Sequence, residues 1–214
     1  MSGGNGGTLG AEQAVRLQEC VTGGGVAVFP TDTVYGVCCD PGSADAVRRL
    51  YELKGRPAAR AAAVMFFSLT RALAALPELG RAERAALHAL LPGPVTVLLR
   101  NESRRFGPAC GGDPNTLGLR VPRLEGPLAA LAAVALPVMQ SSANISGQAD
   151  PRCLSQVPQR LLQGADLTLD AGELAGTPST VVDLRDYANA CRFTVLREGA
   201  LAGAEVQRLL DGAG

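Results

Sequence analysis

Short apolar runs alternate with helical patterns along this chain, without the regular strand–helix–strand rhythm of an all-parallel sheet. The apolar runs predict strands over residues 26–29, 62–67, 95–99, 116–121, 137–140, 166–170, 179–184 and 192–197. The 3.6-residue patterns predict helices over residues 11–21, 44–53, 69–76, 81–91, 126–135 and 201–211. Because strands and helices are mixed irregularly, we expect an α/β fold with an open, twisted, mixed sheet flanked by helices.

The length of the chain favours one domain. With 214 residues it can bury a sizeable core in a single domain or form two small ones. Since no internal repeat or linker divides it, we expect one domain over residues 11–214. The glycine-rich residues 1–10 cannot bury enough apolar surface to offset their ordering entropy, so we expect a flexible, dispensable tail.

Charge and cysteine usage exclude several classes of protein. The 20 acidic and 20 basic residues balance, so no overall field attracts nucleic acid or anionic lipid. No apolar run is long enough to cross a membrane, and the first residues are not typical of a signal peptide. The 6 cysteines lack Cys-x-x-Cys spacing, and Cys38 and Cys39 are adjacent, which suits neither a metal site nor an ordinary disulfide. We therefore expect reduced core thiols and a cytoplasmic location.

Common catalytic and phosphate-binding signatures are missing. The one histidine, His88, lies in a helical pattern and is expected to be structural, so a histidine-rich metal site and a Ser-His-Asp triad are not expected. A P-loop would need serine or threonine after its lysine, but Gly55 follows Lys54. Any nucleotide must therefore be held in another way.

Lys54 is the one lysine among the 20 basic residues. It is either a stray surface residue or part of a site that needs a compact point charge, which arginine cannot supply. It falls at the expected end of the helix over 44–53, for which Ser43 is the expected N-cap. At such an exposed helix end, a Lys54→Arg exchange should slow a reaction without changing stability. Arg56, two residues later, can grip a carboxylate or phosphate with two parallel hydrogen bonds.

Four polar clusters interrupt or end the apolar strands, at residues 31–36, 54–57, 142–144 and 179–180. Strand ends are where α/β proteins usually bind ligands. Each cluster taken singly is also ordinary turn, capping or strand composition. The chemistry must therefore come from the set rather than from any one of them.

The clusters belong to an ordered set of motifs: Phe29-Pro30-Thr31-Asp32-Thr33-Val34-Tyr35-Gly36, Lys54-Gly55-Arg56-Pro57, Leu91-Pro92-Gly93-Pro94-Val95-Thr96, Leu119-Arg120-Val121-Pro122, Ser141-Ser142-Ala143-Asn144-Ile145-Ser146-Gly147, Pro178-Ser179-Thr180-Val181-Val182-Asp183 and Leu196-Arg197-Glu198-Gly199. In order and spacing this set resembles the YrdC-like family of threonylcarbamoyl-AMP synthases. The resemblance covers about residues 11–211.

The resemblance implies a twisted sheet with a concave, electropositive face that binds ligands. It implies a nucleotidyltransferase that joins L-threonine, bicarbonate and ATP into threonylcarbamoyl-AMP and pyrophosphate, for threonylcarbamoyladenosine modification of tRNA. Threonine would be held by Thr33, Arg120 and Ser179. ATP would be held by Lys54, Arg56, Arg60, Thr116, Ser142, Asn144 and Arg197, with Lys54 and Arg56 also serving catalysis.

The implied reaction requires alignment and charge stabilisation rather than a protein nucleophile. No dedicated metal site is expected, but Mg²⁺ should accompany ATP because it binds largely through the phosphates. Asp32 either helps to orient this ion or is a turn residue. Further partners would be tRNA and the downstream threonylcarbamoyl transferases.

The chain departs from the commonest family pattern after Arg60, where it continues Ala61-Ala62-Ala63-Val64-Met65. Met65 cannot donate a hydrogen bond to threonine, as a histidine at the matching place would. Two other classes of function stay open: an RNA-binding module that lacks catalysis, and a paralogue for another carbamoyl substrate, as in hydrogenase maturation. Pyrophosphate release that depends on threonine separates all three.

Overall fold

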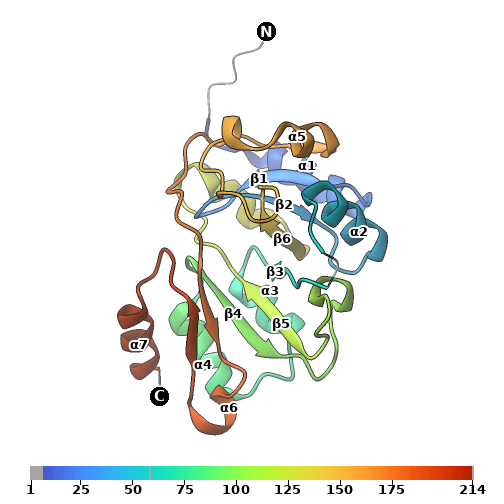
Figure 1. The fold of residues 1–214 in the computed structure, drawn as a ribbon. Helices are drawn as coiled ribbons and strands as arrows, with labels where there is room; N and C mark the ends of the chain where they lie inside the picture. Colours follow the sequence, from blue (N-terminus) through green and yellow to red (C-terminus); the bar gives the residue numbers. More distant parts are fainter. Residues whose placement is uncertain (1–6, 58, 214) are drawn as a thin grey trace.

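The chain forms one twisted, mixed sheet with helices around it (Figure 1). A computed structural model describes residues 7–57 and 59–213. The strand order is β7-β1-β2-β6-β3-β5-β4-β8-β9, in which three neighbouring pairs, β7 with β1, β3 with β5 and β4 with β8, run parallel. The strands are β1 Ala27–Pro30, β2 Tyr35–Cys39, β3 Ala63–Met65, β4 Val95–Arg100, β5 Thr116–Arg120, β6 Val138–Ser142, β7 Leu167–Thr168, β8 Thr180–Asp183 and β9 Thr194–Arg197. The expected fold class is confirmed.

The helices pack around this sheet, with α3 and α4 behind β4 and β5 in Figure 1. The α-helices are α1 Ala11–Thr22, α2 Ala44–Lys54, α3 Leu69–Ala75, α4 Arg81–Leu90, α5 Gln159–Gly164, α6 Tyr187–Ala190 and α7 Gly203–Asp211. The 3₁₀ helices are η1 Gly107–Cys110, η2 Gly126–Ala133 and η3 Leu154–Gln156. Helix α2 begins where the sequence predicted, because the Ser43 hydroxyl accepts a hydrogen bond from the Ala46 amide. It ends at Gly55, whose φ of 59° lies in the left-handed region that glycine adopts without strain.

One face of the sheet is covered along its whole length, and the other face is covered over only half. The larger core cluster packs β-strand side chains from both halves against α2, α4 and α7. The smaller cluster packs α1 and η2 against β1, β6 and β7. On β4, side chains alternate between buried and partly exposed, which leaves Thr96 and Leu98 on an open surface. Figure 1 shows β4 and β5 facing the viewer in this open half.

Three local predictions were wrong. Residues 35–39 form β2, where no strand was predicted, and because all five residues are buried, no alternating pattern marks the strand. Residues 126–133 form a 3₁₀ helix instead of an α-helix, with bonds of the i to i+3 type such as Val134 N to Leu131 O. Strand β6 continues to Ser142, so both serines of the Ser-Ser-Ala-Asn motif lie on the sheet.

The expectations for the tail and the cysteines hold only in part. Residues 1–6 of the expected tail lie outside the described residues. Leu9 is buried in the smaller cluster, and its amide donates to Pro127 O at 2.9 Å, so the ordered chain begins before residue 11. All six cysteines are free, but Cys191 is exposed rather than part of the core. None of the helices in the described part of the chain has the length and apolar character that a bilayer crossing requires.

Candidate functional site

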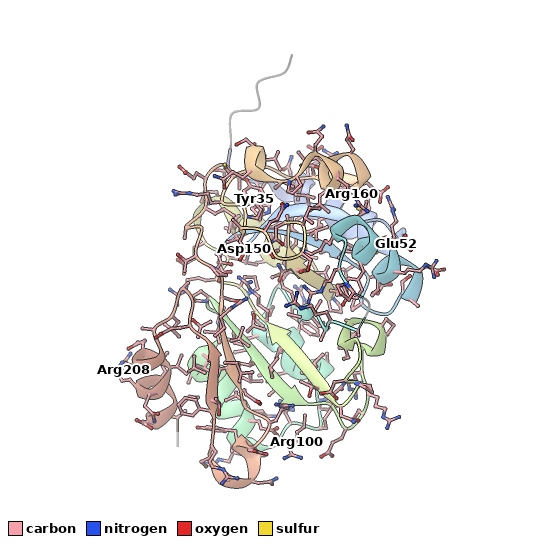
Figure 2. The ribbon with its side chains drawn as sticks, viewed as in Figure 1. Tyr35, Glu52, Arg100, Asp150, Arg160 and Arg208 are labelled. Atoms are coloured by element: carbon pink, nitrogen blue, oxygen red, sulfur yellow. The ribbon has the colours of Figure 1, made fainter. Side chains whose placement is uncertain are left out.

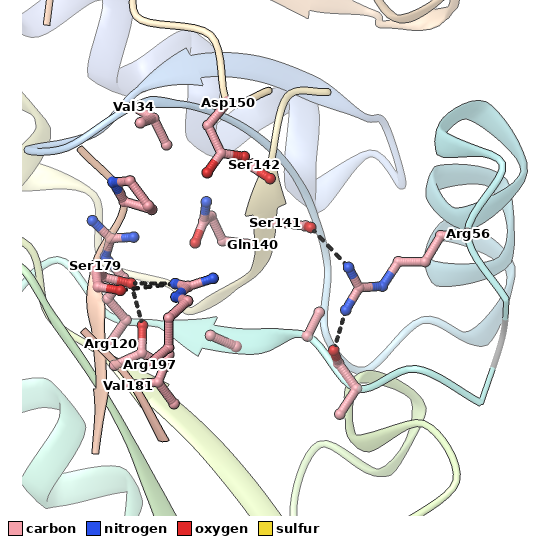
Figure 3. Close-up of a pocket in the computed structure, with 15 residues that line it drawn as sticks. Val34, Arg56, Arg120, Gln140, Ser141, Ser142, Asp150, Ser179, Val181 and Arg197 are labelled. Atoms are coloured by element: carbon pink, nitrogen blue, oxygen red, sulfur yellow. Dashed lines mark hydrogen bonds between the residues drawn. The ribbon is translucent and has the colours of Figure 1, made fainter. Parts of the chain in front are cut away.

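A polar hollow of about 180 Å³ lies where the smaller cluster ends and the open half of the sheet begins (Figure 3). Its lining comes from six strands and the loops beside them: Val34, Arg56, Ala61, Ala62, Ala63, Thr96, Arg120, Gln140, Ser141, Ser142, Asp150, Pro178, Ser179, Val181 and Arg197. The charged members are three arginines and one aspartate. Such a lining suits a ligand that carries more negative than positive charge.

Five of the predicted site residues line this hollow, namely Arg56, Arg120, Ser142, Ser179 and Arg197. They come from segments far apart in the sequence. The fold therefore brings residues predicted to hold threonine and residues predicted to hold ATP to the same hollow. Five others do not line it: Thr33, Lys54, Arg60, Thr116 and Asn144. Thr33, Lys54 and Asn144 lie behind the lining and form hydrogen bonds with Arg120 or Ser142.

Arg120 is the centre of a buried network on one side of the hollow. Its side chain is 4% exposed and forms an ion pair with Asp32, whose side chain is 7% exposed, at 2.6 Å between Nη2 and Oδ1. The same nitrogen donates to the Thr33 hydroxyl at 2.5 Å. Within the described residues, Arg120 Nε has no hydrogen-bond partner. Thr33 and Asp32 therefore fix Nη2 of the guanidinium, while Nε and Nη1 form no hydrogen bond with a described residue.

This network decides the role of Asp32. Its Oδ1 accepts from Arg120, and its Oδ2 accepts from the Arg123 amide at 2.9 Å. The carboxylate is therefore engaged as a buried counter-ion, which is neither of the two roles considered for it from the sequence. A buried arginine requires such a partner, because an uncompensated buried charge is costly.

Ser179 and Arg197 are coupled on the adjacent wall. Arg197 Nη2 donates to the Ser179 carbonyl oxygen at 2.8 Å, and its contact with the Ser179 hydroxyl is 3.4 Å (Figure 3). The hydroxyls of Ser179 and Thr96 lie 2.9 Å apart. Arg197 is exposed on β9, whereas Ser179 is buried. A cation and a hydroxyl thus face the hollow from neighbouring strands.

Lys54 is buried, with 1% of its surface exposed, which contradicts its expected position at an exposed helix end. Its ammonium donates to the carbonyl oxygens of Ser142 and Asn144 and to the side-chain oxygen of Asn144; both bonds to Asn144 measure 2.9 Å. Because an ammonium has three donors, these three acceptors engage all of them. In this structure Lys54 joins α2 to the end of β6, and no donor is left for a phosphate.

Burial of Lys54 also changes its titration. Desolvation, and then the nearby Arg56 charge, lower the pKa of Lys54 to about 7, while the Asp150 carboxylate opposes the decrease. The oxygen acceptors around the ammonium favour its charged form. Lys54 is therefore a buried, fully hydrogen-bonded residue whose pKa lies near neutral pH.

The side-chain amide of Asn144 organises the loop that follows β6. Its oxygen accepts from Lys54 and from the Ser142 hydroxyl, the latter at 2.8 Å. Its nitrogen donates to Gln148 O at 2.6 Å and to Asp150 Oδ1 at 3.0 Å. Since all four hydrogen-bonding positions of the amide are taken, Asn144 shapes the loop, and direct contact with ATP stays a prediction.

Arg56 and Arg60 extend from the segment after α2. Arg56 Nη1 approaches the Ser141 hydroxyl at 3.4 Å, and Nη2 donates to Ala61 O (Figure 3). The guanidinium lies over the Tyr51 ring, 5.7 Å from its centroid. Arg56 is therefore held at the edge of the hollow with its plane fixed. Arg60 is exposed, and its guanidinium approaches the Ser146 hydroxyl at 3.4 Å.

Thr116 lies apart from the hollow, at the other end of β5. It is four residues from Arg120 along the strand, roughly 13 Å at the usual rise per residue. It lines a second hollow on the open half, where its hydroxyl accepts from Arg185 Nη1 at 3.2 Å. Contact between Thr116 and ATP stays a prediction.

Sequence reasoning missed several lining residues. Gln140 and Asp150 are in the hollow, but Gln140 lies in an apolar strand and Asp150 follows the Ser-Ala-Asn motif in ordinary turn composition. Thr96 was quoted only as part of a motif. Met65 is fully buried in the smaller cluster and does not line the hollow, so its lack of a donor does not affect the lining.

The arrangement offers cations and hydrogen-bond donors but no activated nucleophile. His88 is exposed on α4 and does not line the hollow. Among the described residues, no group of three or more His, Cys, Asp or Glu side chains could hold a metal ion. The site is suited to binding and aligning anionic reactants.

Comparison with known sequences gives consistent relatives. Residues 19–199 match the family model of the Sua5, YciO and YrdC proteins, described as "Telomere recombination". A threonylcarbamoyl-AMP synthase of Thiobacillus denitrificans is 34% identical over 164 residues, covering 75% of this chain and 85% of that protein. One of Pyrococcus abyssi is 29% identical over 188 residues, covering 87% of this chain. The chain spans 54% of the length of that Pyrococcus relative.

Solved structures share the fold. Pyrococcus abyssi Sua5 complexed with L-threonine has a TM-score of 0.81 at 26% identity, over 94% of this chain and 58% of that one. Escherichia coli YciO has a TM-score of 0.77 at 24% identity, over 94% and 95% of the two chains, which supports the fold alone. The expected family resemblance is confirmed.

Proposed function

Because this chain belongs to the Sua5, YciO and YrdC family, we propose that it is a threonylcarbamoyl-AMP synthase. It would join L-threonine, bicarbonate and ATP into threonylcarbamoyl-AMP and pyrophosphate, for threonylcarbamoyladenosine modification of tRNA. Relatives with that name share up to 34% identity in these comparisons, and a neighbouring structure holds L-threonine.

One observation carries the proposal: residues assigned to the two substrates line the same hollow. Arg120 and Ser179, assigned to threonine, lie on the walls formed by β5 and β8, while Arg56 and Ser142, assigned to ATP, lie at α2 and β6. Gln140 lies between the two groups in Figure 3. Two reactants bound to these walls would meet over the open sheet.

The residues present suit the reaction by alignment. The amine of threonine would attack the carbon of bicarbonate, forming a carbamate as water leaves. A carbamate oxygen would then attack the α-phosphorus of ATP, and a new oxygen–phosphorus bond would form as the bond to pyrophosphate breaks. Arg120 is placed to hold the threonine carboxylate, because its side chain lines the hollow and its Nη1 forms no hydrogen bond with a described residue. Arg56 and Arg197 would stabilise the charge of the phosphates.

The remaining expectations belong to the same proposal. Mg²⁺ would enter with ATP, since phosphates supply most of its ligands in such sites. Downstream transferases and tRNA would receive the product. The cytoplasm is the proposed location, because Cys38 and Cys39 are buried free thiols that persist in a reducing compartment.

The test is pyrophosphate release by the purified protein with ATP, bicarbonate and threonine. We expect release that requires threonine and that falls about 100-fold in Arg197→Ala, because one preorganised cation on the reacting phosphates is lost. Arg197 is exposed, so the variant should melt like the unaltered protein. Arg16→Ala, an exposed arginine on α1, is the matched control. Release that ignores threonine but follows another carbamoyl donor would indicate a paralogue, and RNA binding without release a non-catalytic module.

A further inference from the structure

Asp150 is the one carboxylate among the residues that line the hollow. Figure 2 places it near the middle of the molecule, and Figure 3 shows it beside Ser142, away from Ser179. Arg120 already has Asp32 as its counter-ion, whereas Arg56 and Arg197 form no ion pair with a described carboxylate. Asp150 forms no ion pair with any described residue. Its charge is therefore free to act on what the hollow binds.

The carboxylate is held in place from two directions. Its Oδ1 accepts from Asn144 Nδ2 at 3.0 Å, and Asn144 is itself held by Lys54. The backbone is fixed to β2, because Pro151 O accepts from the Tyr35 amide at 2.9 Å. Within the described residues, Asp150 Oδ2 has no hydrogen-bond partner. One oxygen is thus anchored and the other is available.

A fixed carboxylate on the ATP side of the hollow repels a triphosphate unless a cation lies between them. Mg²⁺ has the required charge and chemistry, because it is usually bound by one or two carboxylates, by substrate phosphates and by waters. The described residues contain no group of three or more His, Cys, Asp or Glu that could hold a metal alone. A single carboxylate facing bound phosphates fits this kind of ion.

We propose that Asp150 Oδ2 is the protein ligand of the Mg²⁺ that enters with ATP, directly or through one of the ion's waters. This inference rests on the proposed binding of ATP in the hollow. Asn144 and Lys54 are then positioning residues, because they aim the carboxylate and need not touch the nucleotide. The other cation among the reactants is the ammonium of threonine, and the threonine-binding measurement below distinguishes it from Mg²⁺.

The experiment measures ATP affinity by calorimetry, with and without Mg²⁺, for the unaltered protein and for Asp150→Asn. Mg²⁺ should tighten ATP binding by the unaltered protein, and Asp150→Asn should reduce this enhancement by about 10-fold, as loss of a metal-orienting group does. Without Mg²⁺ the variant should bind ATP at least as well as the unaltered protein, because a like charge is removed. Binding of Mn²⁺ to the ATP complex, followed by electron paramagnetic resonance, gives a second readout.

The controls separate the alternatives. Asp45→Asn removes an exposed carboxylate on α2 and should leave the Mg²⁺ enhancement unchanged. An unchanged enhancement in Asp150→Asn overturns the inference, and weaker threonine binding with unchanged enhancement assigns Asp150 to the ammonium instead. If the unaltered protein forms no pyrophosphate but Asp150→Asn still loses the enhancement, the proposed function fails and the Mg²⁺ assignment stands. Absence of ATP binding by the unaltered protein overturns both.

Discussion

Two buried cations lie near the hollow, Arg120 in its lining and Lys54 behind it, and they are stabilised in different ways. Arg120, 3% exposed, has a carboxylate partner in Asp32. Lys54, 1% exposed, has neutral oxygen acceptors from Ser142 and Asn144. Arg120 can contact a ligand because part of its guanidinium is uncommitted, whereas the donors of Lys54 are all engaged.

The difference shows why the two residue types are not interchangeable. A guanidinium keeps its charge when buried, and its fixed fork can serve a counter-ion and a ligand together. An ammonium is compact enough to lie among three oxygens, but it loses its proton more readily when desolvated. We therefore expect substitution of Arg120 to lower stability by leaving Asp32 without its counter-ion. Substitution of Lys54 should change stability through the size of the side chain and through its pKa.

The largest effect should come from removing one member of the Arg120–Asp32 pair. Arg120→Met leaves a buried carboxylate without its counter-ion, which should lower the free energy of unfolding by about 3–5 kcal/mol. Urea denaturation measures this loss. The double variant Arg120→Met with Asp32→Leu should recover most of it, because no buried charge remains. Equal losses in the single and double variants would show that the ion pair is not the cause.

A smaller effect is expected for Lys54→Arg. The larger, planar head group does not fit among the three oxygens around Nζ, so the variant should lose about 1–3 kcal/mol of stability, as overpacked cores do. This replaces the expectation of unchanged stability that followed from an exposed helix end. Arg48→Lys, an exposed exchange on the same helix, should unfold like the unaltered protein. Equal urea midpoints for Lys54→Arg and the unaltered protein would contradict the buried position.

The smallest effect concerns pH. The pKa of Lys54 is lowered to about 7 in the folded protein and is about 10.4 in an unfolded chain, so above pH 7 the unfolded state binds more protons. The free energy of unfolding should therefore rise with pH, by at most about 1.4 kcal/mol per pH unit, and lose this dependence below pH 7. Unfolded thiols have a pKa of about 8.5, so denaturation is measured from about pH 6.5 to 7.5 and compared with Lys54→Met, which contains the same cysteines. Lys54→Met should lack the rise, and parallel curves for the two proteins would disprove the assigned titration.

Local sequence signals were sufficient for most of the secondary structure. Ser43 and Gly55 bound α2 because a hydroxyl cap and a left-handed glycine act within a few residues. The apolar periodicity located α1, α4 and α7, and the ordered motifs identified the family. Arg56, Arg120, Ser142, Ser179 and Arg197 were implied by the family resemblance of their motifs, and the structure brings all five to one hollow.

Only the tertiary structure decided how these residues act. Arg120 meets Asp32 across 88 positions of the sequence, and Lys54 meets Asn144 across 90. No local pattern shows that the lysine at the end of α2 turns inward, or that one oxygen of Asp150 is anchored and the other available. Helix ends follow from interactions between residues that are near neighbours in the sequence, so the sequence determined them. Burial, counter-ions and the direction of a charged group depend on which distant strands pair, and the sheet order alone fixes that.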